Sequence, residues 1–207
     1  MVAEHAIPYV HWGVFNINKI KECFAIEGDN ILINVDADNY LEIMKSMSLL
    51  IPEPCFFILE VPCSKEKEAE LNKGKEDTLH NDVYYLDNID HKFMLSILND
   101  LGDILINDGI SSFGFSSLKD QIEIMKCKYN LISIYSKIRD PFIQKLKELG
   151  IEEVDNIITA GDLISENNPG ICKRYVSPKG KDIFDIVKSL SKVGMYLDHV
   201  EWFSLKH

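Results

Sequence analysis

Strict alternation of side chains predicts β-structure in the middle of the chain. Phe113 and Phe115 fall on one face of an extended strand over residues 110–117, and mostly small side chains fall on the other. The alternating segments 121–127 and 131–136 flank a short turn, which is typical of an antiparallel hairpin. Because Gly114 lacks a side chain, we expect another backbone or a ligand to approach closely there.

Similar patterns predict the other strands. Residues 23–26 and 31–35 flank the turn-rich tetrapeptide 27–30 and predict a second hairpin. The segment 7–17 is apolar on both faces, as in a strand that is covered on both sides. Further strands are expected at residues 55–61, 83–86 and 195–205.

Apolar residues that recur at intervals of three and four predict four helices, at about residues 40–50, 93–105, 142–149 and 183–190. Asp36 or Asp38 is expected to cap the first, Asp90 the second and Asp140 the third, since Asp accepts hydrogen bonds from the first helical N–H groups. Gly150 follows the third helix and predicts its end.

These elements together predict an α+β fold with a mainly antiparallel sheet, hairpins and about four covering helices. We expect one domain over residues 1–207. Residues 64–77 form a run of mixed charge with one large apolar side chain, Leu71, so we expect a mobile loop there. The pattern at 151–176 leaves the structure of this segment open, apart from a turn at residues 167–170.

The charge distribution narrows the classes of partner that the protein can bind. The formal net charge is −11, and residues 1–100 account for most of it, with 18 Asp and Glu against 8 Lys. Such a field repels phosphate backbones and anionic lipid and favours a basic protein. Arg139 and Arg174 are the only arginines, so the bidentate contacts usual in phosphate recognition are scarce. We therefore expect neither nucleic-acid nor membrane partners.

The five cysteines form no CxxC pair, which argues against a zinc site and against a secreted disulfide framework. No apolar run approaches the length of a bilayer, and the first residues lack the pattern of a signal peptide. We expect a cytoplasmic protein, of bacterial type, that needs no cofactor. Trp12 and Trp202 lie in apolar strand patterns, which favours core positions over binding anchors.

The densest polar cluster lies between residues 80 and 91. His80, Asp82, Asp87 and His91 carry the imidazole and carboxylate ligands that suit a divalent metal, and a metal-bound water could act as a hydrolytic nucleophile. The spacing matches no defined metal motif. Ordinary roles as a loop end, a turn and a helix start therefore explain these residues better.

No catalytic signature stands out, so the sequence favours a binding protein over an enzyme. We expect an acidic protein that neutralises a basic partner, as an immunity-type protein does with a toxin. Asp82, Asp87 and Asp100 are the candidate partner-binding residues, and their replacement by Asn should slow association. The alternatives are a metal-assisted hydrolase built on the His80–His91 cluster and a structural or oligomerisation module.

Overall fold

The computed structural model describes residues 20–36, 38–62, 80–163 and 173–202. Their strands form one nine-stranded sheet in the order β8-β1-β2-β7-β6-β5-β3-β4-β9. All neighbouring pairs are antiparallel except β1 with β8. The bounds are β1 Cys23–Glu27, β2 Asn30–Asn34, β3 Cys55–Pro62, β4 His80–Ile89, β5 Ser112–Ser117, β6 Ile122–Lys126, β7 Leu131–Ser136, β8 Glu152–Glu153 and β9 Tyr196–Trp202.

Both predicted hairpins are confirmed. In the first, Ile26 of β1 pairs with Ile31 of β2, and Gly28 in the turn has a φ of +62°. In the second, β6 and β7 pair through a turn in which Tyr129 and Asn130 both have a φ of 62°. Glycine and asparagine tolerate this left-handed backbone, whereas a tyrosine adopts it rarely. The sheet joins the two hairpins through the β2–β7 pair, so it is larger than the hairpins alone indicated.

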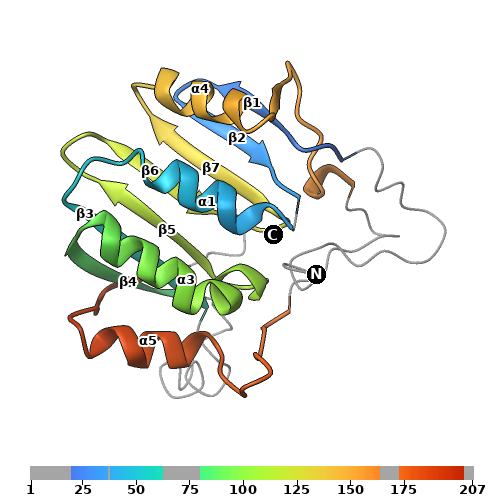
Figure 1. Cartoon of the computed structure of the whole chain (residues 1–207). Helices are drawn as coiled ribbons and strands as arrows, with labels where there is room; N and C mark the ends of the chain where they lie inside the picture. Colours follow the sequence, from blue (N-terminus) through green and yellow to red (C-terminus); the bar gives the residue numbers. More distant parts are fainter. Residues whose placement is uncertain (1–19, 37, 63–79, 164–172, 203–207) are drawn as a thin grey trace.

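Four α-helices occur among the described residues, and all lie on one face of the sheet (Figure 1). They are α1 (Tyr40–Ser48), α3 (His91–Asn107), α4 (Asp140–Glu148) and α5 (Ile183–Ser191), and a short 3-10 helix spans Gly161–Leu163. None of the described helices is both long and apolar enough to cross a bilayer. The α+β class with a mainly antiparallel sheet is therefore confirmed.

The predicted cap of α3 is confirmed, because the Asp90 carboxylate accepts a hydrogen bond of 2.7 Å from the Phe93 amide. The caps predicted for α1 and α4 are wrong. Asn39 and Arg139 occupy the two N-cap positions without a capping side-chain bond. Asp36 instead accepts from the Asp38 amide in the turn before α1, at 3.0 Å.

Helix α4 begins one residue earlier than the Asp140-Pro141 pair suggested. Asp140 is its first helical residue and Pro141 follows at the second position, where a missing N–H costs nothing. A negative charge at this end still favours the helix dipole. Gly150, with a φ of +80°, lies just beyond the end of α4 as predicted.

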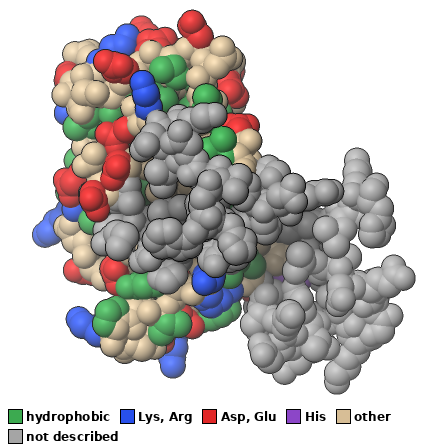
Figure 2. All heavy atoms as spheres, turned by 90° about the vertical axis from the view of Figure 1, so that its right-hand side faces the viewer, with side chains coloured by type: hydrophobic (Ala, Val, Ile, Leu, Met, Phe, Trp, Pro, Cys, Tyr) green, Lys and Arg blue, Asp and Glu red, His purple; other side chains and the backbone are tan. Residues whose placement is uncertain are grey.

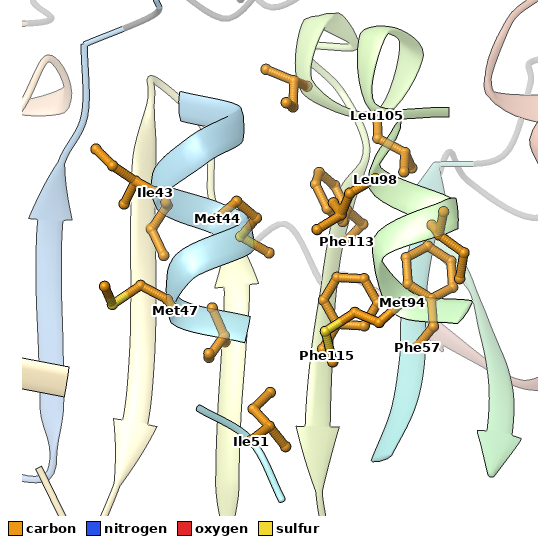
Figure 3. Packing of buried hydrophobic residues seen from close by; sticks show 14 of the residues in the cluster. Ile43, Met44, Met47, Ile51, Phe57, Met94, Leu98, Leu105, Phe113 and Phe115 are labelled. Carbon is orange, nitrogen blue, oxygen red and sulfur yellow. The ribbon is translucent and has the colours of Figure 1, made fainter. Parts of the chain in front are cut away.

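The core lies between the helices and one face of the sheet (Figure 3). Met44 and Met47 from α1 and Met94 from α3 are fully buried against it. Phe57 of β3 lies with its ring centroid 5.4 Å from that of Phe115 on the neighbouring strand β5. Burial of a side chain of this size contributes roughly 1.5–3 kcal/mol, so this layer sets which face the helices cover.

Several predictions fall outside the described residues. These are the strand at 7–17 with Trp12, the mobile loop at 64–77 and the turn at 167–170. The terminal strand is confirmed as β9, although the structure describes no side chain for Trp202.

Candidate functional site

The two faces of the sheet differ sharply in chemistry. Along the register, the side chains that face the helices are large and apolar, among them Ile33, Ile134, Ile124, Phe115 and Phe57. Their sequence neighbours point the other way because side chains alternate along a strand. We call this second side the glutamate face, and its central row reads Ala25, Leu32, Ser133, Met125, Gly114, Ile58, Tyr85 and Tyr196.

The charged side chains of the glutamate face are almost all acidic. Five of its described strand positions are acidic, namely Glu27, Glu60, Glu123, Asp198 and Glu201. No described strand position of this face holds Lys or Arg. Glu123 and Glu201 are exposed and Glu60 is half-buried. In the quarter-turned view, by contrast, Lys and Arg side chains lie among the acidic ones (Figure 2). At its described strand positions, the glutamate face therefore carries several carboxylates and one basic side chain, that of His199.

Glu60 lies at the centre of this charge. Its pKa is raised above the ordinary value of 4.5, first by burial and then by Glu201 and Glu123, with a smaller opposing effect from His199. A carboxyl whose pKa is raised in the folded state opposes folding when it is ionised. The protein therefore keeps a charge here at some expense of stability.

We expect Glu60→Gln to stabilise the protein at pH 7, by on the order of 0.5 kcal/mol after allowance for solvent screening. The wild-type carboxyl opposes folding at neutral pH, and this opposition fades as pH falls through the raised folded pKa. The gain from the variant should therefore shrink in acid. Urea unfolding at pH 7 and pH 4 measures the difference in unfolding free energy between the variant and the wild type. The control is Glu27→Gln, at an exposed position. A variant that is less stable than the wild type at pH 7 would contradict this assignment.

A pocket of about 590 Å³ lies at the edge of the glutamate face, where four strands end or begin. The start of β3 supplies Phe56, the end of β4 supplies Tyr85 and Asp87, and the start of β9 supplies Tyr196 and Asp198. The remaining lining residues are Glu53, Pro54, Cys55, Asn88, Ser117, Leu118, Lys119 and Asp120. The lining thus holds four carboxylates and a single lysine.

Aromatic rings form the wall of the pocket. The centroids of Phe56 and Tyr85 are 5.5 Å apart, and the Tyr196 hydroxyl donates a 2.9 Å hydrogen bond to Asp87. Burial and then the carboxylates of Asp198, Glu123, Glu60 and Asp87 raise the pKa of Tyr85. The potential at this ring is therefore negative, which disfavours an anion and favours a cation.

The cysteine in the pocket is not a nucleophile. Cys55 is buried, and its thiol contacts the Ile89 carbonyl oxygen at 3.4 Å. Burial, then the nearby Glu53 carboxylate, raises the pKa of Cys55 to about 11. The thiol is therefore protonated at neutral pH, and only a thiolate attacks.

The four predicted metal ligands do not gather at one point. His80 and Asp82 are both buried, with Nε2 of His80 3.8 Å from Oδ1 of Asp82, on the side of the sheet that faces the helices. Asp87 lies in the pocket at the edge of the glutamate face, and His91 begins α3 with its Nε2 2.8 Å from the Ile51 carbonyl oxygen. Among the described residues, no group of three His, Cys, Asp or Glu side chains could hold a metal ion.

The three predicted partner-binding residues lie in three different environments. Asp82 is 4% exposed, and the Tyr84 hydroxyl donates to it at 3.3 Å. Asp100 is exposed on α3, a helix on the opposite side of the sheet from the glutamate face. Of the three, only Asp87 lines the pocket.

Sequence reasoning missed Glu60, Glu123, Asp198, Glu201 and the aromatic wall. The alternation of β3 and β6 was a usable signal, since one Glu of each strand falls on the face away from the buried side chains. No local sequence pattern predicts that β9 pairs with β4. A search of protein-family models, curated proteins and solved structures finds no match to this chain.

Proposed function

We propose that this protein is a binding protein that holds a basic protein against its glutamate face. The observation that carries the proposal is the charge pattern of that face, which presents carboxylates and no Lys or Arg at its described strand positions. A field of one sign steers an oppositely charged partner and raises the association rate.

The pKa of Glu60 supports the same proposal. Burial and like charges oppose its ionisation, so a neutral side chain would stabilise the fold better at this position. Residues that lower stability while keeping a charge are typical of functional surfaces. An immunity-type protein, which neutralises a basic toxin in the cytoplasm, fits this chemistry.

The partner surface joins residues from both halves of the chain. Glu60 comes from the acidic first half, whereas Glu123 and Glu201 come from the second. The charge difference between the halves of the sequence is therefore a poor guide to the charge of a surface.

The test uses a fluorescently labelled octalysine peptide and two triple variants that remove equal charge. Glu60→Gln/Glu123→Gln/Glu201→Gln neutralises the glutamate face, and Glu42→Gln/Asp100→Asn/Glu148→Gln neutralises exposed positions on the helices. We expect wild type to bind in a salt-dependent way. The first triple variant should bind about tenfold more weakly, as three screened charge contacts imply, and the second should change less than about twofold.

Two results contradict the proposal. If both triple variants lose affinity equally, the peptide responds to the net charge of −11 and not to one face. If neither variant changes the affinity, the glutamate face takes no part in binding.

A further inference from the structure

We propose that the pocket between β3, β4 and β9 receives one arginine side chain of the basic partner. This inference rests on the proposed function and names the group that anchors the partner. The pocket of about 590 Å³ opens at the edge of the glutamate face, so a protein held against that face can reach it with a long side chain.

The aromatic wall suits a flat cation. The Phe56 and Tyr85 rings lie at 48° to each other with centroids 5.5 Å apart, and Tyr196 is 44% exposed beside them. A guanidinium group stacks on an aromatic face, is more weakly hydrated than an ammonium group and is attracted by the negative ring face. The wall therefore favours arginine over lysine.

Two carboxylates near this wall are already held in position. Asp87 accepts from the Tyr196 hydroxyl at 2.9 Å through Oδ2, and Asp198 lies 2.8 Å from Nδ1 of His199 through its own Oδ2. Among the described contacts, Oδ1 of each carboxylate makes no hydrogen bond. A contact of this kind at Oδ2 orients the carboxylate, so less side-chain entropy is lost when a guanidinium group arrives.

The single basic residue of the lining provides an opposite test. Lys119 lies in the exposed turn between β5 and β6, next to Leu118, which is 82% exposed. Its positive charge repels an incoming guanidinium group. Removal of Lys119 should therefore strengthen binding, whereas removal of a pocket carboxylate should weaken it.

The experiment titrates N-acetyl-arginine amide into the ¹⁵N-labelled full chain and follows amide shifts by NMR. Citrulline has nearly the same shape as arginine but no charge, so N-acetyl-citrulline amide is the matched ligand control. We expect saturable shifts at pocket residues with a Kd on the order of 10 mM, and at least about fivefold weaker binding of the citrulline amide. Tyr85→Leu and Asp198→Asn should each lower the affinity for the arginine amide about threefold to fivefold, and Lys119→Gln should raise this affinity about twofold. The exposed helical variant Asp100→Asn should bind like wild type.

Equal affinity for the arginine and citrulline amides overturns the proposal, and so does the absence of shifts in the pocket at ligand concentrations above about 10 mM. A lysine amide that binds as tightly as the arginine amide overturns the assignment of guanidinium. Failure of the proposed function can be told apart from failure of the arginine pocket. If the proposed function fails, the Glu60/Glu123/Glu201 variant binds octalysine as the wild type does, while the arginine amide still occupies the pocket.

Discussion

Asp108→Ala is expected to lower the free energy of unfolding by about 3–5 kcal/mol. Asp108 is fully buried at the end of α3, and its Oδ1 accepts from the Ile110 and Ser111 amides at 3.1 and 2.8 Å. Its Oδ2 accepts from the Tyr175 amide at 3.1 Å, which ties Tyr175 to the junction between α3 and β5. Alanine leaves all three N–H groups without this acceptor. The Ser111 bond is buried and the other two are partly buried. An unsatisfied buried donor costs about 1–3 kcal/mol, and the buried carboxylate loses its own bonds as well.

Urea unfolding measures this loss, with Asp100→Ala on the exposed side of α3 as the matched control. That control should change stability by less than about 0.5 kcal/mol. Asp108→Asn keeps the volume of the side chain but replaces one acceptor by a donor. Its loss of unfolding free energy should therefore lie between those of Asp108→Ala and Asp100→Ala. A loss below about 1 kcal/mol for Asp108→Ala would show that the carboxylate does not hold this junction together.

Gly114→Ala is expected to cost about 3 kcal/mol, because the sheet leaves no room for a Cβ atom there. An added Cβ would collide with the Ile124 carbonyl oxygen and with Sδ of Met125 on the neighbouring strand β6. Methionine can move aside, but the carbonyl can retreat only if the β5–β6 pairing opens. This confirms the expectation that a backbone approaches closely at Gly114.

A double variant separates these two collisions. Gly114→Ala/Met125→Ala removes the flexible neighbour and keeps the backbone collision, so it should not recover the stability lost by Gly114→Ala. Ser112→Ala, two residues earlier on the same face of β5, should be nearly neutral. Thermal and urea unfolding would refute the steric account if Gly114→Ala matched Ser112→Ala.

Much of the fold follows from local patterns in the sequence. The hairpins around Gly28 and Asn130 and the Asp90 cap of α3 depend on residues close together in the chain, and each is confirmed. Strand order depends on contacts between distant segments, which no local pattern encodes. The error at Asp140 concerned one residue, since an Asp-Pro pair fits both the cap and the first turn of a helix.

The site was far less predictable. Asp82 looked like a surface charge beside Asp87, but the register of β4 turns its side chain to the buried face. Asp198 reaches the pocket only because β9 pairs with β4 from more than a hundred residues away, with a register shift between Val83 and Tyr84. Charge along the sequence placed the acidity in the first half, whereas Glu123, Asp198 and Glu201 of the glutamate face come from the second half.

The most direct measurement of the central claim is a map of where a basic peptide binds, from amide shifts of the ¹⁵N-labelled protein titrated with octalysine. We expect the shifts to concentrate on β3, β4, β6 and β9, around Glu60, Glu123 and Glu201, and to become smaller as the salt concentration rises. Shifts that concentrate on α1, α3 and α4, or that spread evenly over both sides of the sheet, would contradict the assignment of the glutamate face as the binding surface.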